Sequence, residues 1–419
     1  MRKRVAICLS LVAGVLLSII AVTCVKPPAG HYDFNLRMNE ISCVVQGVNP
    51  FAVWNESVVL PPYVSNIPRK PARSDCNQPV NAYAPWEYLY MMPLVFLPRS
   101  IAWFVYSMFM AVAMLMLIWI SRPTDARGRL GCDVMLLSAV PFIVIYYLLW
   151  SNASVGNFIV FVLLASVLMA WALARDRWFF AGVFWALAMV KPQSAILFVV
   201  PLLMRRRMPV CIVAGLICLI ASVPPSIMCS ASLLDMLVQG PAANAELFEG
   251  CGTWPKFLCG RLGGGFDIGM GLAIGTAFCV WMTWMLRKER DWLVYLMPAA
   301  ICASCWTYTQ VYSHAMGWFV AYAIVSSLLE NPRSKFLWTL FAISIPVLSR
   351  VFLAWHGFSA FFGFEFPMSE YAFRCVDSLN STASLAIAVA YCLWWRKNAA
   401  CSRRSLALAP GSSRGRLCR

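Results

Sequence analysis

The chain has 419 residues, 61% of them hydrophobic and 12% charged, and its mean hydropathy of +0.70 exceeds what a soluble globular protein carries. Its formal net charge of +16 is spread in short clusters between apolar runs, with no continuous basic face and no nucleic-acid motif, so we expect no nucleic-acid partner. The composition predicts an all-α, polytopic transmembrane protein, because lipid cannot satisfy exposed backbone groups and helices satisfy their own.

The first apolar run, Val5–Val25, follows a basic start at Arg2, Lys3 and Arg4. A signal peptide begins in the same way. This run is longer than a typical signal-peptide core, however, and no small-x-small cleavage site precedes Lys26. We therefore expect it to be retained as the first membrane span.

Further apolar runs follow along nearly the whole chain, and a helix of roughly 20 residues crosses about 30 Å of hydrocarbon. We expect about eleven membrane segments. A short piece, Tyr88–Leu97, lies between Pro85 and Pro98 and is either a half-helix at the outer face or an extension of the span after it. The expected spans are Val5–Val25, Arg99–Ile120, Val134–Trp150, Phe158–Ala174, Trp178–Met204, Val210–Met228, Ile268–Leu286, Trp292–Tyr308, Ala315–Leu329, Phe336–Trp355 and Thr382–Trp395.

Clusters of Lys and Arg separate these runs, and the positive-inside rule predicts that all of them are cytoplasmic. Arg175 and Arg177 can then share a side with Arg205–Arg207 only if Trp178–Met204 enters the membrane and returns as a broken, re-entrant hairpin. Lys191-Pro192 stands at the middle of this segment, where proline interrupts a helix. The alternative is one kinked span, which would put Arg205–Arg207 and every later cluster outside.

This topology predicts a single transmembrane domain over 1–396, with a first extracytoplasmic loop over 26–87, and a basic cytoplasmic tail over 397–419. Both termini are then cytoplasmic, in a multi-pass protein of a bacterial inner membrane, since no organelle signal is apparent. Some cysteines on the outer side could pair in an oxidising exterior, although the sequence does not say which. These are Cys43, Cys76, Cys229, Cys251, Cys259 and Cys375.

Several short motifs follow one another along the chain. Their order and spacing resemble those of the GT-C superfamily, most closely glycosyltransferase family 87. Such enzymes take mannose or arabinose from a polyprenyl phosphate. The likeness extends from about Asp33 to Tyr322, with departures at Arg37, Ala84-Pro85 and Val155-Gly156-Asn157. The motifs are His31-Tyr-Asp33-Phe34, Gly47-Val-Asn49-Pro50-Phe51, Asn81-Ala-Tyr83-Ala-Pro85-Trp86, Gly156-Asn157, Ala181-Gly182 before Lys191-Pro192, and Tyr308–Tyr312 with His314.

Asp33 is the expected catalytic residue. An acceptor hydroxyl is a poor nucleophile, and a carboxylate within hydrogen-bond reach can take its proton as the bond to the anomeric carbon forms. The resemblance implies a single displacement that inverts this carbon. The alternative is that Asp33 only caps the helix that follows it.

The other candidate residues are expected to bind the substrate. Lys191 would meet the lipid phosphate, because an ionisable group inside the membrane is costly without a partner, although a lysine can also extend its ammonium to water. Arg350 has the same two interpretations. His314 could hydrogen-bond phosphate or sugar, or be structural, and Tyr83 could stack on a sugar or belong to an interfacial aromatic belt. The resemblance implies a substrate contact for Asn157.

We therefore expect a glycosyltransferase that moves a hexose from a polyprenyl-phosphate donor to an extracytoplasmic glycan or glycolipid, and the resemblance implies mannose. No cofactor is expected, and the absence of Asp-x-Asp from the first loop gives no indication of a divalent metal. A transporter or flippase for a lipid-linked saccharide is the alternative, since broken helices and intramembrane cations also mark transport sites. A non-catalytic subunit would leave Asp33 and Lys191 unexplained.

Overall fold

The computed structural model describes residues 32–50, 84–120, 156–238, 264–306, 315–349 and 370–407. These residues form helices joined by turns, with no strand among them, which confirms the expected all-α class. The elements are α2 (Tyr32–Val45), α4 (Pro85–Val95), α5 (Arg99–Ile120), α7 (Ile159–Leu173), α8 (Trp178–Ala188), α9 (Pro192–Ala195), η2 (Ile196–Phe198), α10 (Val199–Met204), α11 (Met208–Met228), α14 (Gly264–Met285), α15 (Trp292–Trp306), α16 (Trp318–Glu330), α17 (Lys335–Ser349) and α19 (Glu370–Ala407).

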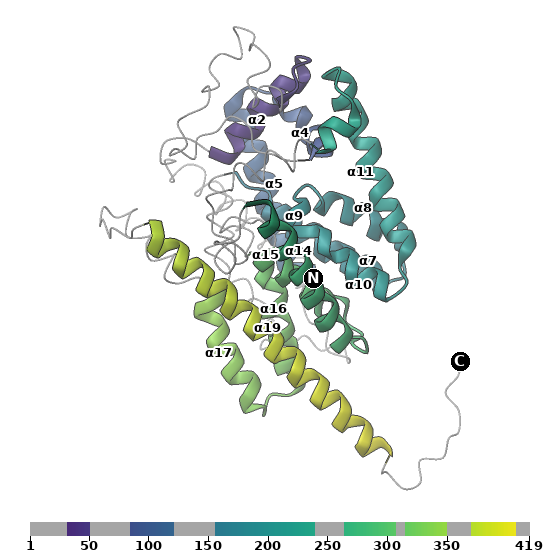
Figure 1. The fold of residues 1–419 in the computed structure, drawn as a ribbon, viewed down its shortest axis with the longest axis vertical. Helices are drawn as coiled ribbons and strands as arrows, with labels where there is room; N and C mark the ends of the chain where they lie inside the picture. The colour runs from purple at the N-terminus through teal and green to yellow at the C-terminus, as the bar shows by residue number, and fades with distance from the viewer. Residues whose placement is uncertain are drawn as a thin grey trace, which may run out of the picture.

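The helices pack in two groups that meet at α7 and α15 (Figure 1). In the first group α2 packs on α4, α4 on α11, α11 on α8 and α8 on α7. In the second, α14 packs on α15, α15 on α16 and α16 on α17, and the long helix α19 lies against α15 and α17. Helix α15 also contacts α7, α9 and η2, so it joins the two groups.

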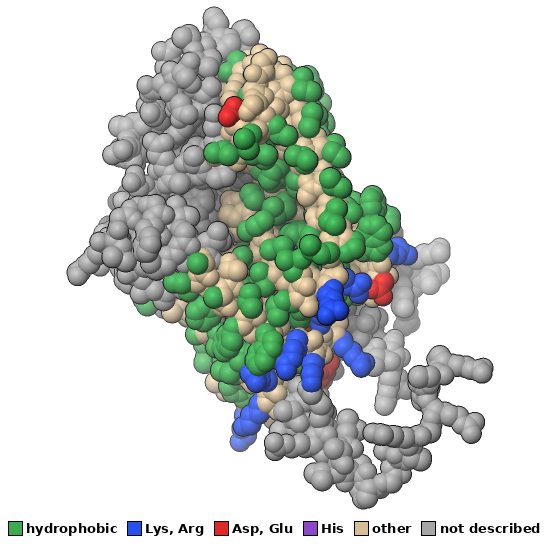
Figure 2. All heavy atoms as spheres, turned by 45° about the vertical axis from the view of Figure 1, so that its right-hand side comes forward, with side chains coloured by type: hydrophobic (Ala, Val, Ile, Leu, Met, Phe, Trp, Pro, Cys, Tyr) green, Lys and Arg blue, Asp and Glu red, His purple; other side chains and the backbone are tan. Residues whose placement is uncertain are grey.

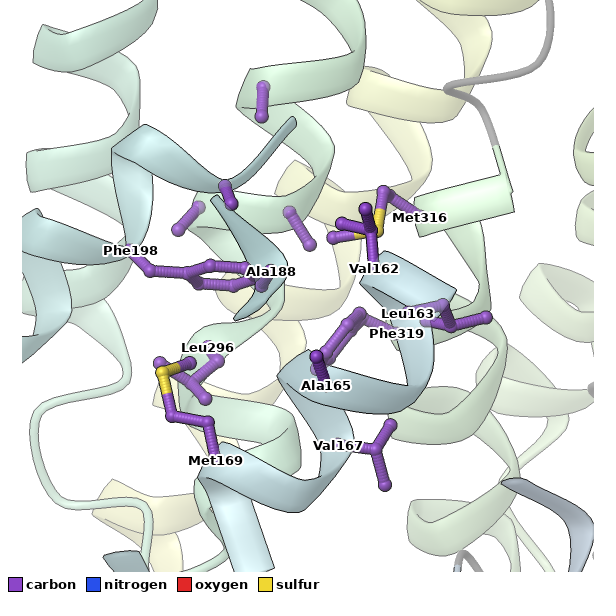
Figure 3. Packing of buried hydrophobic residues seen from close by; sticks show 14 of the residues in the cluster. Val162, Leu163, Ala165, Val167, Met169, Ala188, Phe198, Leu296, Met316 and Phe319 are labelled. Carbon is purple, nitrogen blue, oxygen red and sulfur yellow. The ribbon is translucent and has the colours of Figure 1, made fainter. Parts of the chain in front are cut away.

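Helix α7 forms the centre of the core. Its sequence is apolar on every side, and a helix of that kind is stable only when it is surrounded. Side chains from α7, η2, α15 and α16 meet here, including Met169, Phe198, Leu296 and Phe319 (Figure 3). The rings of Phe198 and Phe319 lie 6.0 Å apart, so the broken segment that contains η2 is packed directly into the core.

The segment 178–204 folds back on itself, as the hairpin prediction requires. Its two arms hold 11 residues in α8 and 13 residues from Pro192 to Met204, so they are about 16 and 20 Å long at 1.5 Å per residue. Collinear arms would separate their outer ends by more than 30 Å, yet the Nη2 of Arg207 lies 2.7 Å from Oδ1 of Asp176. The segment therefore folds back on itself, and its entry into the membrane stays a prediction.

The structure also decides between the two alternatives for Tyr88–Leu97. Helix α4 ends at Val95, and its axis is bent by 119° from the first part of α5. Pro98 precedes α5, and a residue before proline is disfavoured in the helical conformation, which explains the break. Helix α4 is therefore a separate short helix and does not extend α5, and its position at the outer face stays a prediction.

By length and apolar composition, Met208–Met228 is the one helix in the described ranges that could cross a membrane alone, and the bent pair α4–α5 would add a second. Seven other apolar stretches are shorter, so the described residues do not confirm eleven spans. One side of α11 exposes large apolar residues such as Ile220 and Ile227, which are 66% and 72% exposed. This surface and the apolar helices support association with a membrane.

Basic residues gather at one end of the molecule (Figure 2). Arg205 donates a hydrogen bond to the backbone oxygen of Glu289, and its guanidinium lies 4.5 Å from the ring centre of Trp292. Arg396 lies 4.6 Å from the ring of Trp284, near Arg287. The clusters around 175, 205, 287 and 396 therefore share one end, as the topology prediction requires.

Candidate active site

Lys191 stands at the break between α8 and α9. Because Pro192 follows, the helical conformation is disfavoured at Lys191, whose φ and ψ are −115° and 83°. The side chain is 3% exposed, and its Nζ donates a hydrogen bond of 2.7 Å to Oδ1 of Asn157. The ammonium is therefore held inside the protein at a defined position, and it does not extend to water.

Asn157 connects the break to the start of α7. Its Oδ1 accepts both the Lys191 ammonium and, at 3.1 Å, the backbone N–H of Ile159, the first residue of α7. The backbone oxygen of Asn157 accepts a hydrogen bond of 2.8 Å from the hydroxyl of Tyr106 on α5. Asn157 is only 1% exposed, so these contacts define the position of both its side chain and its backbone.

Gly156 brings the first turn of α2 to the same place. Its φ is +85°, a conformation that favours glycine, and a Cβ added to it would lie 2.3 Å from the Cβ of Phe34 and 2.8 Å from the Phe34 nitrogen. Only glycine allows the two backbones to approach this closely. Asp33 precedes Phe34 and belongs to the first turn of α2, which begins at Tyr32. The structure describes the backbone of Asp33 but not its side chain.

Aromatic rings surround this junction. The Phe34 ring lies 5.2 Å from Trp103 and 5.3 Å from Tyr106, and Tyr106 lies 5.3 Å from Phe158. The rings come from α2, α5 and the residue before α7. Most of these pairs are edge-on or tilted, and Trp103 and Tyr106 are stacked at 5.4 Å; both arrangements are favoured for aromatic pairs. The cluster anchors the start of α2 beside Gly156-Asn157.

Helix α4 is tied to the break as well. The indole N–H of Trp86 donates a hydrogen bond of 2.8 Å to the backbone oxygen of Met189, two residues before Lys191. Within the hairpin, the indole of Trp185 donates to the backbone oxygen of Ala195 at 3.0 Å. Two tryptophans thus satisfy backbone oxygens on either side of Lys191, where the interrupted helix leaves carbonyl groups without their usual partners.

Sequence analysis did not single out a second buried charged group, on α2 and α4. Arg37, Glu40 and Glu87 are each 1% exposed or less, and Arg37 Nη1 lies 2.5 Å from Oε2 of Glu40. A signal was present, because Arg37 and Glu40 share the face of α2 that carries Phe34, Met38 and Ile41. Charged residues on an otherwise apolar helix face indicate a buried ion pair. Trp86, next to Glu87, joins this group to the Lys191 break.

The structure brings together three of the motifs identified in the sequence: Asp33-Phe34, Gly156-Asn157 and Lys191-Pro192. Tyr83, His314 and Arg350 lie outside the described residues, and their roles stay predictions. Within the described ranges no group of three or more His, Cys, Asp or Glu side chains could hold a metal ion. A buried ammonium can hold an anion, and the backbone of the helix that carries Asp33 lies against the Gly156-Asn157 turn to which Lys191 is bonded.

A family model described as glycosyltransferase family 87 matches residues 81–307, more than half of the chain. The matched part contains Trp86, Asn157 and Lys191, whereas Asp33, His314 and Arg350 lie beyond its ends. Neither the curated proteins nor the solved structures give a match. The match confirms the resemblance found in the sequence and makes the transporter alternative unnecessary: the chain belongs to glycosyltransferase family 87 and is a transferase enzyme.

Proposed function

We propose that this enzyme moves a hexose, mannose in the first instance, from a polyprenyl-phosphate donor to an extracytoplasmic glycan or glycolipid, with inversion at the anomeric carbon. The membrane protein would have about eleven segments, with both termini and the basic end in the cytoplasm. Its reaction would then take place near the opposite end, where α2 and α4 pack together.

The observation that carries the proposal is the continuous path from Lys191 to Asp33. Lys191 is bonded to Asn157, the preceding Gly156 lies against Phe34, and Asp33 is the residue before Phe34. A cation that suits a phosphate and a carboxylate that suits a hydroxyl are thus held on neighbouring backbone segments. The burial of Lys191 against Asn157 supports the binding role over a lysine that extends to solvent.

In this mechanism the Asp33 carboxylate accepts the proton of the acceptor hydroxyl as its oxygen bonds to the anomeric carbon. The bond from that carbon to the donor phosphate oxygen breaks at the same time, and the polyprenyl phosphate leaves with the electron pair. An ammonium has three donor hydrogens, so Lys191 can keep its bond to Asn157 and donate to the phosphate as well. Stabilising charge that develops on the leaving group is often the largest single contribution to catalysis.

The test is transfer by the purified full-length enzyme. Radiolabelled polyprenyl-phosphate-mannose and a membrane glycolipid extract should together yield a labelled glycolipid, and the anomeric configuration of the new linkage should be opposite to that of the donor. GDP-mannose in place of the lipid donor should yield none. Chelation of divalent metals should leave the rate unchanged, because the proposed chemistry uses protein groups only.

The controls separate the parts of the proposal. Transfer from GDP-mannose without lipid would contradict the lipid-linked donor, and retention of configuration would contradict the single displacement. Replacing mannose by other hexoses on the same lipid then identifies the sugar. Absence of transfer with every polyprenyl-phosphate hexose and acceptor extract would contradict the proposed donor class.

A further inference from the structure

In the described part of the chain, three tryptophans at the basic end each lie against two arginines. A guanidinium within about 6 Å of an indole ring is attracted to its face, so each ring helps to hold its two cations in place. Two like charges gathered at one ring repel each other, and an anion beside them would offset the repulsion. The pairs are Arg175 and Arg177 on Trp171, Arg205 and Arg207 on Trp292, and Arg287 and Arg396 on Trp284.

At the first two rings the protein supplies acceptors itself. Asp176 is paired with Arg207 at 2.7 Å, and its neighbours in the chain are the two arginines of Trp171, so a carboxylate belongs to this group of cations. Arg205 donates a hydrogen bond to the backbone oxygen of Glu289. These arginines therefore contribute to the packing of the basic end.

The pair on Trp284 is different. The Cζ of Arg287 lies 4.3 Å from the ring centre and that of Arg396 lies 4.6 Å from it, and neither guanidinium forms an ion pair with a carboxylate of the described residues. Arg287 donates at 3.1 Å to the backbone oxygen of Trp284, as basic residues at helix C-termini often do. Arg396 comes from the interior of α19, so it has no helix end to stabilise.

Apolar side chains lead along both helices to these two arginines. On α14, Phe278, Trp281 and Trp284 follow at helical spacing and are 36–39% exposed, and on α19 Leu393, 50% exposed, lies one turn before Arg396. The two helices pack against each other, and Figure 2 shows an apolar surface that ends in basic residues. Tryptophan and arginine gather where lipid headgroups meet acyl chains. The order of side chains therefore matches a phospholipid, with chains along the apolar residues and a phosphate at the arginines.

We propose that Arg287, Trp284 and Arg396 bind the phosphate of an anionic phospholipid of the phosphatidylglycerol type. Each guanidinium donates to phosphate oxygens, for which its planar fork is suited, and Trp284 holds the two guanidiniums beside each other. The charges are complementary, because two cations without a carboxylate partner meet a headgroup with a net negative charge. A zwitterionic headgroup brings its own cation and loses this advantage. The inference rests on the association of the chain with a membrane, not on the sugar chemistry proposed above.

The first experiment measures lipid binding to the purified full-length protein in a neutral detergent. Native mass spectrometry gives the dissociation constant for phosphatidylglycerol, and phosphatidylcholine with the same acyl chains is the comparison. Arg287→Gln and Arg396→Gln should each weaken phosphatidylglycerol binding about fivefold, which corresponds to about 1 kcal/mol for a cation near an anionic headgroup. Arg175→Gln, which removes an exposed arginine from Trp171 at the same end, should leave the affinity unchanged.

A second pair of variants separates this site from the general effect of charge. Trp284→Leu should weaken phosphatidylglycerol binding although the net charge stays the same, because the ring that holds both guanidiniums is lost. Trp281→Leu is the matched control: Trp281 is 38% exposed against 39% for Trp284, and no arginine lies on it among the described residues. The Trp281 variant should bind as the unaltered protein does. Equal affinities in the two leucine variants would contradict the proposed site.

Inorganic phosphate distinguishes the lipid from a free anion. In large excess it should not displace phosphatidylglycerol, because the acyl chains add to the affinity; displacement at concentrations similar to that of the lipid would replace the proposal by a site for free phosphate. Equal binding of phosphatidylglycerol and phosphatidylcholine, or an unchanged affinity in both glutamine variants, would overturn it. Sugar transfer is not measured in any of these experiments, so failure of this inference leaves the proposed function intact.

Discussion

At the scale of single residues, the proposed site depends on two charged side chains, Lys191 and Asp33. A structural role and a chemical role for each predict different effects of substitution. Lys191 is buried and bonded to Asn157, so the interpretation that it extends to water does not fit its surroundings. Asp33 lies in the first turn of α2, where a carboxylate also stabilises the helix dipole. Glu40, the other carboxylate of this helix, is paired with buried Arg37, which makes it a poor proton acceptor.

For Asp33, substitution by Asn retains the shape and the hydrogen-bonding capacity of the side chain at a helix start, but removes the charge and with it the base. Asp33→Asn should stay folded and bind the donor while turnover falls about 10²–10⁴-fold, and Asp33→Ala should be no faster and less stable than Asp33→Asn. Turnover per folded molecule, measured with thermal stability, separates the two roles. An active Asn variant together with an Ala variant that loses about 1 kcal/mol of stability would leave Asp33 with a structural role only.

For Lys191, the charge itself is expected to bind the donor phosphate. Lys191→Met should weaken binding of the lipid phosphate by about ten- to a hundredfold, since a charge-assisted hydrogen bond contributes about 1.5–3 kcal/mol, and Lys191→Arg should keep part of the affinity. Titration of each purified variant with the donor gives the affinities. Lys288→Met, at the exposed basic end, is the control for loss of a positive charge. Equal affinities in the two Met variants would remove Lys191 from the site.

At the scale of elements, close backbone approaches and interrupted helices position the site. The turn at Gly156 sets the start of α7 against α2, and the break before Pro192 aims Lys191 at Asn157. Aromatic side chains complete these junctions: Trp86 and Trp185 bond to backbone oxygens near the break. The site is therefore assembled from element ends, where backbone groups outside regular helix need partners from elsewhere.

The Gly156 junction can be tested with a matched pair of glycines. Gly156→Ala should lower the free energy of unfolding by about 2–4 kcal/mol, because alanine is strained at positive φ and its Cβ would overlap Phe34. Gly215→Ala, in the interior of α11 with nothing within 4 Å, should be neutral or stabilising by up to about 1 kcal/mol. Thermal unfolding of both variants in the same detergent measures the difference. Equal stabilities would mean that the Gly156 turn does not touch α2.

At the scale of the whole molecule, charge and apolar surface are separated along the long direction. Basic clusters meet at one end, apolar side chains cover the middle, and the junction of α2, α4 and α11 lies at the other end (Figures 1 and 2). The folded-back hairpin is what allows Arg207 to reach Asp176. This distribution matches a protein whose basic end faces the cytoplasm.

Accessibility of residue 206 tests this orientation. Arg206→Cys, in a background without the native cysteines, should react with a membrane-impermeant maleimide only after the membrane is opened, because Arg206 is exposed at the basic end. A cysteine introduced in the first loop, at Arg69, should react in intact cells. Reaction of residue 206 in intact cells would reverse the orientation and move the proposed reaction to the other side.

Composition and local pattern were sufficient to predict the helical class, the family and the position of most helices. The expected span at Arg99–Ile120 coincides with α5, and Val210–Met228 differs from α11 by two residues at its start, because apolar length and flanking charge are properties of the local sequence. The fold-back at Lys191-Pro192 was predictable too, since proline and the flanking charges are local signals. The catalytic and binding roles stay predictions.

Tertiary structure decided which of these segments meet. No local pattern indicates that Asn157 receives the Lys191 ammonium, that Gly156 lies on Phe34, or that Arg396 lies on Trp284, because each contact joins segments that are distant in the chain. The burial of Glu87 likewise depends on how α4 packs against α2 and α11. The sequence determined which helices form, because their apolar length and periodicity suit a lipid environment. Packing alone determined which helix ends come together at the proposed site.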